Sequence, residues 1–386
     1  MLPDGLPRRS FLGGVGMGSA AWVAGTALAA EPSPKKQWQP TTDRKVRVGI
    51  VGYGACSFGA AFGFQDHPNV EVVAVSDLFS DRRAALAKAC RCEKTYESLE
   101  VLVKDPQIEA VFVATDAPSH ARHCIEVLHH GKHVMTAVPA VFGSLEQAEQ
   151  LLAEVEQTRL KYMMAETSCY RADCHAMRTI YQADGFGRLV YSEGEYYHYA
   201  VHLTASYKNW RVGLPPLWYP THSTAYYVGV TGKRLMSVSC QGFRGPTPIY
   251  GKGNNAYDNP FRDEVALFKT SEGGGSRMSM CRSVYGLVAE VGRVYGERGW
   301  MDATGYHGEE KKLPDVGRPA LPRGMPPGGH GGSHGHLTHE FITAILEDRQ
   351  PLVNVYEALA MTVPGIIAHQ SALRDGETLA VPQFDE

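Results

Sequence analysis

The stretch from Val46 to Asp77 limits the possible folds of this chain more than any other segment. An apolar run of strand length, Val46–Val51, leads directly into Gly52-Tyr53-Gly54. A helix-like stretch follows, and a second apolar run ends at Asp77, twenty-three positions after Gly54. A strand, a glycine turn, a helix, a second strand and an acid in this order are what a dinucleotide-binding βαβ unit requires. The alternative is an ordinary glycine turn in an α/β protein.

The glycines and the acid each have a physical role in such a unit. Gly52 allows the tight turn, and Gly54 lets the backbone approach the pyrophosphate, which rests on the N-terminus of the following helix. The Asp77 carboxylate can accept hydrogen bonds from the adenosine ribose hydroxyls and would repel the 2′-phosphate of NADP. We therefore expect NAD as the cofactor, with NADP less favoured.

Two details modify this expectation. Ser57 occupies the position of the third glycine, with Gly59 two residues later, so we expect the helix to pack slightly less closely on the strand. Arg82 and Arg83 follow Asp77 by about one turn and could offset the repulsion of a 2′-phosphate. The default interpretation of these arginines is a solvated helix face.

Composition and charge exclude several functional classes. At 386 residues the chain is long enough for two domains of ordinary size. A formal net charge of −3 with 20% charged residues predicts neither a nucleic-acid surface nor an acidic tail. The eight cysteines show no zinc-ribbon spacing, and several fall in predicted core elements, so we expect buried thiols.

The N-terminus is typical of a targeting segment. Arg8-Arg9-Ser10-Phe11-Leu12 is a twin-arginine start, and an uncharged run extends from Gly13 to Ala30. Small residues at 27–29 suit cleavage, and the run is too glycine-rich for a good transmembrane anchor, although an uncleaved anchor is the alternative. We expect residues 1–30 to be a signal segment, residues 31–44 a linker, and the mature protein to be periplasmic or otherwise exported, without a membrane span.

Alternating strand and helix patterns between residues 45 and 165 predict a doubly wound, NAD-binding Rossmann domain with a parallel sheet. Strands are expected at 46–51, 71–76, 108–114, 133–137 and 161–165, and helices at 55–65, 80–89, 118–130 and 144–158. Ligands in such sheets bind beyond the carboxyl ends of the strands. We therefore expect the cofactor to meet Gly52, Gly54, Ser57, Asp77, Thr115, His120 and Pro139.

Residues 166–386 predict a second, α+β domain that binds the substrate. A helix is expected at 172–183 and a strand at 187–198, and aromatic, glycine-rich strands to about residue 300 favour a large, mostly antiparallel sheet. Residues 305–335 are dense in Gly, Pro and His and predict a long loop of the kind that is usually functional. Two closing helices are expected at 337–349 and 355–374.

These features together resemble the glucose-fructose oxidoreductase / inositol dehydrogenase / MocA (Gfo/Idh/MocA) family from about residue 45 to 382. The resemblance rests on the opening glycines, on Ala114-Thr115 with Pro118 and His120, on the segment 133–139 and on Glu193-Gly194. It implies a two-domain enzyme that holds NAD or NADP and moves hydride between the nicotinamide and a ring carbon of a sugar or cyclitol. It also implies a second-domain sheet that can pack face to face in a homo-oligomer.

Two positions depart from the pattern of that family. The family usually has Glu-Lys-Pro at the end of the fifth strand, with a catalytic lysine, whereas this chain has Ala137-Val138-Pro139. The family also tends to place an Asp four residues before a catalytic His, and the residue in that position before His222 is Trp218. Because an alcohol dehydrogenation needs a base for the hydroxyl proton, part of the usual machinery is missing here.

A subgroup of NAD-dependent glycosidases, typified by α-N-acetylgalactosaminidase, resembles the chain in further short motifs. These are 166–170, 193–198, 219–222 and the glycine-rich 328–332. The resemblance implies a redox-neutral cycle: a sugar hydroxyl is oxidised, the leaving group is eliminated from the neighbouring carbon, water is added and the hydride returns.

The candidate catalytic residues are His222, Tyr196, His198 and Glu166, with Tyr219 and His330 on the substrate side. Strand alternation places Tyr196, His198 and His202 on one face, where polar-tipped rings are costly to bury without partners. A histidine or tyrosine can act as the base of an elimination, and a tyrosine can polarise a ketone oxygen. The alternatives are a structural cap for His222 or Glu166 and core packing for the tyrosines.

Four histidines, His330, His334, His336 and His339, raise the question of a metal site. No thiolate, and no carboxylate other than Glu340, stands among them in the sequence. We therefore expect a glycine-rich substrate loop and no metal.

The expected protein is an exported, NAD-binding oxidoreductase that acts on a carbohydrate by hydride transfer at a ring carbon. The first alternative is an NAD-dependent glycosidase with the redox-neutral cycle. The second is a non-catalytic sugar-binding relative, suggested by Val138 and Trp218. No nucleic-acid partner is expected.

Overall fold

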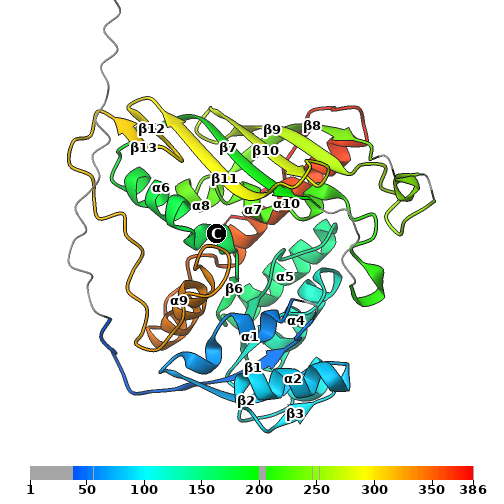
Figure 1. Ribbon diagram of the computed structural model, residues 1–386, viewed down its shortest axis with the longest axis vertical. Helices are drawn as coiled ribbons and strands as arrows, with labels where there is room; N and C mark the ends of the chain where they lie inside the picture. Colours follow the sequence, from blue (N-terminus) through cyan, green and yellow to red (C-terminus); the bar gives the residue numbers. More distant parts are fainter. Residues whose placement is uncertain (1–37, 55, 200–205, 246, 252, 386) are drawn as a thin grey trace, which may run out of the picture.

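The computed structural model describes residues 38–54, 56–199, 206–245, 247–251 and 253–385, and two β-sheets organise this part of the chain (Figure 1). The predicted signal segment and His202 lie outside the described residues. None of the described helices has the length and apolar character of a membrane span.

The first sheet is parallel, with the strand order β3-β2-β1-β4-β5-β6. Its strands are β1 (Val46–Val51), β2 (Val70–Ser76), β3 (Thr95–Tyr96), β4 (Ala110–Val113), β5 (His133–Thr136) and β6 (Tyr162–Met164). Every residue of β4 and β6 is buried, as expected for parallel strands covered on both faces. The strand order reverses between β1 and β4, which is where a doubly wound sheet binds its ligand. The predicted Rossmann sheet is confirmed.

The first helix of this half is shorter in the structure than the sequence predicts. They are α1 (Phe58–Ala61), η1 (Phe64–Asp66), α2 (Ser80–Cys90), α3 (Leu99–Leu102), η2 (Ala117–Ser119), α4 (His120–His129) and α5 (Leu145–Thr158). A single helix over 55–65 is wrong. The α1 helix ends at Ala61, because Gly63 adopts a left-handed φ of 73° and a separate 3₁₀ turn, η1, follows.

The second sheet has eight strands in the order β13-β12-β11-β7-β10-β9-β8-β14 among the described residues. They are β7 (Leu189–His198), β8 (Leu235–Phe243), β9 (Asp263–Thr270), β10 (Gly275–Cys281), β11 (Val288–Gly296), β12 (Gly299–Asp302), β13 (Gly305–Gly308) and β14 (Leu379–Ala380). Only the pair β7–β10 is parallel, which confirms a mostly antiparallel sheet. The hairpin of β12 and β13 takes up the first residues of the loop predicted at 305–335.

Helices fill the space between the two sheets (Figure 1). One face of the second sheet is covered by α6 (Ala172–Gln182), α7 (Thr221–Thr224), α8 (Val228–Thr231) and α10 (Val355–Ala372), and α10 also packs on α5. The short 3₁₀ turns are η3 (Thr167–Tyr170), η4 (Tyr207–Asn209), η5 (Pro216–Trp218) and η6 (Pro248–Tyr250). The helix α9 (His334–Leu346) returns to the first sheet, where the Thr338 hydroxyl donates to the carbonyl oxygen of Phe62 at 2.8 Å.

The α7 helix lies unusually close to the second sheet. A Cβ atom added to Gly194 in β7 would stand 1.9 Å from the carbonyl oxygen of Ser223 in α7. Only a glycine at this strand position allows such an approach. The contact presses α7, and with it His222, against β7 on the side that faces the first sheet.

Candidate active site

A cleft of about 360 Å³ opens at the carboxyl ends of β1, β2 and β4. Four of the predicted cofactor residues, Gly52, Gly54, Asp77 and Thr115, line it. Ser57, His120 and Pro139 do not line it. The cleft therefore coincides with the position that the strand order assigns to a dinucleotide.

The three glycines in and after this turn allow the close packing and the open backbone that a pyrophosphate site needs. Gly52 has a φ of 96°, and an added Cβ would lie 2.4 Å from the carbonyl oxygen of Ala114. Gly54 has no atom within 4 Å of an added Cβ, so its backbone borders open space. At Gly59 a Cβ would lie 2.4 Å from the carbonyl oxygen of Gly52. The predicted looser packing is wrong, because Gly59 supplies the close helix–strand contact that Ser57 cannot.

Asp77 is buried at the end of β2 and is held by backbone N–H groups. Its Oδ2 accepts from the N–H of Tyr53 at 2.8 Å and its Oδ1 accepts from the N–H of Phe79 at 2.9 Å. Each carboxylate oxygen keeps a second lone pair for a ribose hydroxyl. Arg82 also lines the cleft and stacks on Phe79, 4.7 Å from the ring centroid. The described residues thus fit an NAD-type dinucleotide.

His120 and Pro139 brace the cleft from behind. His120 is buried, with Nδ1 2.8 Å from the carbonyl oxygen of Pro139 and Nε2 3.3 Å from that of Thr115. Thr115 itself reaches His123, with 2.8 Å between Oγ1 and Nδ1. His120 therefore ties together the loops after β4 and β5 and does not line the cleft.

A second cavity of about 760 Å³ adjoins the first and lies between the two sheets. Tyr196, His198, Tyr219, His222 and His330 all line it, so the structure brings together five of the six predicted catalytic and substrate residues. Cys56, Phe58 and Arg211 line both cavities. The sixth residue, Glu166, is fully buried behind His222.

His222 and Glu166 form an ion pair at the wall of this cavity. The Nδ1 of His222 lies 2.8 Å from Oε1 of Glu166, which also accepts from the N–H of Ser168 at 2.8 Å. Burial alone would lower the pKa of His222, but the carboxylates of Glu166 and Glu290 outweigh it and raise that pKa to about 9. Burial opposes ionisation of Glu166, yet His222 holds the pKa of this carboxyl below its usual value. Glu166 therefore orients the imidazole and keeps it protonated at neutral pH.

Two tyrosines surround the imidazole of His222. The ring centroids of Tyr196 and Tyr219 lie 4.6 Å and 5.7 Å from that of His222. Burial, with Tyr219 and Glu290 nearby, raises the pKa of Tyr196 above its ordinary value. Tyr196 therefore keeps its proton and can donate a hydrogen bond to a substrate oxygen. Tyr196 and His198 share one face of β7, with ring centroids 5.9 Å apart, as the alternation predicts.

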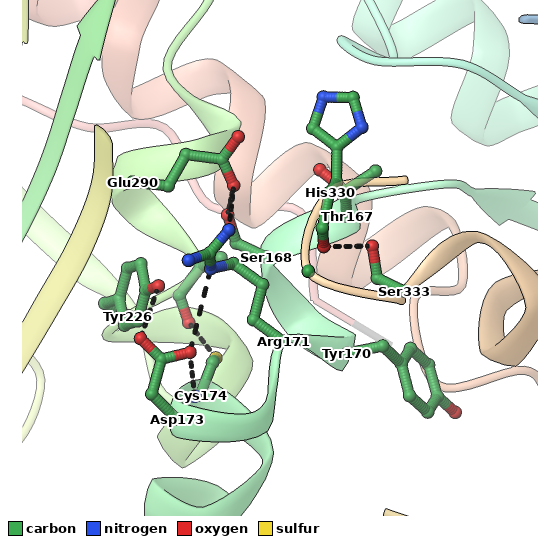
Figure 2. A network of polar contacts seen from close by, with 12 residues as sticks. Thr167, Ser168, Tyr170, Arg171, Asp173, Cys174, Tyr226, Glu290, His330 and Ser333 are labelled. Carbon is green, nitrogen blue, oxygen red and sulfur yellow. Dashed lines mark hydrogen bonds and ion pairs between the residues drawn. The ribbon is translucent and has the colours of Figure 1, made fainter. Parts of the chain in front are cut away.

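The glycine-rich loop brings His330 to the opposite side of His222. The two rings are nearly parallel with centroids 6.2 Å apart, and Nδ1 of His330 lies 2.8 Å from Nε2 of His334. The Ser333 hydroxyl donates to the carbonyl oxygen of His330 at 2.9 Å, which closes the loop (Figure 2). Burial and the charge of His222 lower the pKa of His330, so it is neutral.

The sequence analysis missed a second carboxylate, Glu290 on β11. Its Oε2 accepts from the Ser168 hydroxyl at 3.1 Å and lies 3.7 Å from Nη1 of Arg171 (Figure 2). Ser168 thus joins Glu290 to Glu166 through its side chain and its backbone. No motif marks Glu290, because it reaches this place only through the pairing of β11 with β7.

Val138 and Trp218, the two residues that depart from the pattern of the family, have different surroundings. Val138 lines the second cavity, where the family usually has its lysine. Trp218 instead packs away from it, against Phe142 and Tyr257, with ring centroids 5.3 and 5.4 Å away. The carboxylate partner of His222 therefore comes from Glu166, at the end of the first sheet.

The four histidines examined for metal binding do not converge. His330 pairs with His334, His336 stacks on Tyr170, and His339 meets His67. Within the described residues no cluster of three or more His, Cys, Asp or Glu could hold a metal ion. The absence of a metal stays a prediction.

A Rossmann sheet whose dinucleotide cleft adjoins a histidine- and tyrosine-lined cavity beneath a second sheet is the arrangement that an NAD-binding oxidoreductase requires. Residues 46–166 match the family model described as "Oxidoreductase family, NAD-binding Rossmann fold". This match confirms the resemblance to the Gfo/Idh/MocA family that was found in the motifs.

Two known proteins are similar to this chain in sequence. "Glycosyl hydrolase family 109 protein 3" of Phocaeicola vulgatus is 36% identical over 178 residues, which are 43% of this chain and 31% of that protein. The chain thus spans about a third of this relative's length. "Glycosyl hydrolase family 109 protein" of Streptomyces filamentosus is 26% identical over an alignment that covers 96% of this chain and 88% of that protein.

A solved structure shares the fold of both sheets. Scyllo-inositol dehydrogenase from Lactobacillus casei, with bound NAD(H) and scyllo-inositol, has a TM-score of 0.68 at 15% identity, over 87% of this chain and 99% of that chain. At this identity the likeness concerns the fold alone. The family match and the names of the relatives are the basis of the function proposed below.

Proposed function

We propose that this enzyme acts on a sugar or sugar derivative by hydride transfer at a ring carbon, with His222 as the acid/base. The observation that carries the proposal is that the dinucleotide cleft and the His222 cavity adjoin and share Cys56, Phe58 and Arg211. NAD, when bound, supplies the hydride acceptor and donor. We propose NAD over NADP because of the buried Asp77 carboxylate in the cleft.

The residues of the second cavity can manage the proton that accompanies the hydride. His222, held protonated by Glu166, can donate a proton or a hydrogen bond to a carbonyl oxygen of the sugar. After losing its proton, the same imidazole can accept one from a hydroxyl or from an acidified C–H bond. The neutral Tyr196 hydroxyl adds a second donor for the sugar oxygen.

A second candidate function is an NAD-dependent glycosidase with a redox-neutral cycle. It is favoured by the apolar Val138, which leaves the cavity without the usual lysine, and by the names of the relatives. Oxidation of a ring hydroxyl would acidify the neighbouring C–H, so His222, in its deprotonated form, could remove that proton as the aglycone leaves. Water then adds and the hydride returns.

The experiment that tests these functions uses nitrophenyl glycosides of both anomers in deuterated water without added NAD. Release of nitrophenol with deuterium in the sugar identifies the glycosidase. Release without deuterium contradicts the elimination. Hydride exchange between added NAD and free sugars, without nitrophenol release, identifies the plain dehydrogenase. Failure of both reactions across a broad sugar panel, with NAD bound, contradicts catalysis and favours a sugar-binding role.

The outer face of the second sheet supports a homo-oligomer. Leu267 on β9 pairs with Ser239 on β8, and Phe243 lies four residues further along β8 on the same face. Leu267 and Phe243 are 57% and 52% exposed. Exposed apolar side chains grouped on a sheet are typical of a protein–protein contact. We propose pairing through this face.

A further inference from the structure

The wall of the second cavity carries three arginines and no acidic residue. Arg211, Arg262 and Arg282 line it, and none of the described lining residues is Asp or Glu. The internal positions outside the described residues, 55, 200–205, 246 and 252, contain no Asp or Glu in the sequence either. At the surface of the cavity, no described acidic residue therefore balances the charges of Arg282 and Arg211.

Arg282 has no counter-ion among the described residues, and neither has Arg211. The Nη1 atom of Arg282 only donates to the carbonyl oxygen of Leu214, at 3.4 Å. Burial lowers the pKa of Arg282. The charge of Arg211 lowers this pKa further, whereas two nearby tyrosines raise it. A guanidinium nevertheless stays protonated in proteins. The two cations thus line the same cavity, and the charge of Arg211 disfavours the charged form of Arg282.

The acids next to Arg282 serve other groups. Oδ1 of Asp263 accepts from the backbone N–H of Arg282 and of Ser283, at 2.6 and 3.0 Å. Glu264 is fully buried, with Oε1 2.5 Å from Nδ1 of His369, and its Oε2 accepts from the N–H of Leu217 at 2.7 Å. The charge of His222 is already matched by Glu166. Glu264 acts on Arg282 only through space, and no described carboxylate forms an ion pair with the Arg282 guanidinium.

We infer that this cavity binds a sugar bearing an anionic group: a carboxylate, a sulfate ester or a phosphate ester. The inference rests on the proposed function and defines its substrate class. Guanidinium forks pair with such oxyanions through two parallel hydrogen bonds, and an anion would relieve the repulsion between Arg282 and Arg211. Pro248, Ile249 and Met280 give the same cavity an apolar side for the sugar ring. Its volume suits a glycoside-sized ligand.

Arg282 is the decisive residue because it lines only the second cavity, whereas Arg211 also borders the dinucleotide cleft and can meet a cofactor phosphate. Calorimetry on the NAD-loaded protein compares methyl glucoside and methyl galactoside with the matching uronides, 6-sulfates and 6-phosphates. We expect at least one anionic series to bind about 10- to 100-fold more tightly than its neutral parent. Added salt should reduce that difference. The three series also identify which anion the enzyme prefers.

Variants separate a role in binding from a role in folding. Arg282→Gln should remove the preference for the anion, Arg282→Lys should retain part of it, and Arg244→Gln, at an exposed position outside the cavity, should change nothing. If Arg282→Gln does not fold, Arg282→Lys and the salt dependence of binding by the wild type still test whether Arg282 binds the anion.

Three results overturn the inference in distinguishable ways. Equal binding of neutral and anionic sugars contradicts the anionic substrate class but leaves the proposed function intact. A preference that survives in Arg282→Gln contradicts the role of Arg282. Binding of no sugar at all by the NAD-loaded protein contradicts the proposed function together with the inference.

Discussion

Glu166 follows β6 directly and accepts hydrogen bonds from both Ser168 and His222. The sequence could place this carboxylate at the ligand edge of the sheet, and it could select His222 from its motif. It could not join them, because they are 56 positions apart and meet only when α7 packs against η3, which follows β6. The same limit explains why Glu290 was missed. Single residues were therefore predictable where a local motif encodes them, and their partners were not.

The raised pKa of His222 predicts a rate that increases with pH. Since the imidazole must lose its proton to act as a base, oxidation of a sugar hydroxyl should accelerate as pH rises toward about 9. Glu166→Gln removes the carboxylate that raises this pKa, so the rising limb of the pH–rate profile should move to lower pH. A limb that stays in place would show that Glu166 does not control the imidazole.

At the cofactor, Gly54→Val should abolish NAD binding, because a side chain would enter the open space beside the Gly54 backbone. Asp77→Ala should weaken NAD by about tenfold or more through lost hydrogen bonds to a charged group, and it should narrow the gap between NAD and NADP. Calorimetry measures the affinities for NAD and NADP on nucleotide-free samples of the wild type and of both variants. Wild-type protein that binds neither dinucleotide would refute the cofactor assignment.

At the scale of elements, the approach of α7 to β7 holds the site together. Five of the six strands of the first sheet were predictable to within two residues, because continuous apolar runs mark buried parallel strands. The two-residue strand β3 was not predicted. The break after α1 and the β12–β13 hairpin were not, since single glycines and short pairings decide them. The contact of Gly194 with Ser223 is equally invisible to local patterns, because it joins a strand to a distant helix.

This contact makes Gly194→Ala a test of how α7 positions His222. The added methyl would meet the Ser223 carbonyl, so we expect a loss of about 1–3 kcal/mol in stability and a lower turnover with NAD affinity retained. Gly275→Ala on β10 is the control, because its Cβ would have only ordinary contacts, the nearest at 3.6 Å. Thermal melts and activity measurements on both variants provide the comparison. Equal behaviour of the two would contradict this role for Gly194.

At the scale of the whole molecule, segments that follow the second sheet in the sequence pack back on the first sheet and join the two. After the second sheet, α9 packs back on the first, and the carbonyl of Val353 accepts from the backbone N–H of Met164 at 3.0 Å. The walls of the second cavity therefore come from both ends of the sequence. The two sheets and their order of succession could be predicted from alternating patterns. The cavity between them could not, because its lining joins residues around α1 to residues 329–334, which are far apart in the sequence.

Export is a property of the whole chain that we propose from the Arg8-Arg9 motif. Replacing both arginines by lysine should retain the protein in the cytoplasm, because the twin-arginine route recognises the arginine pair. Fractionation of a compatible host expressing either form measures this. Unchanged export of the double variant would exclude this route.

The most direct test of the account is a single-turnover measurement of hydride transfer from sugar to enzyme-bound NAD, in the wild type and in His222→Ala. We predict that reduced nicotinamide forms in the wild type and forms roughly 10²–10⁴-fold more slowly in the variant, with the same amount of NAD bound. Equal rates in the two proteins, or a wild type that holds NAD but transfers no hydride from any neutral or anionic sugar, would contradict it.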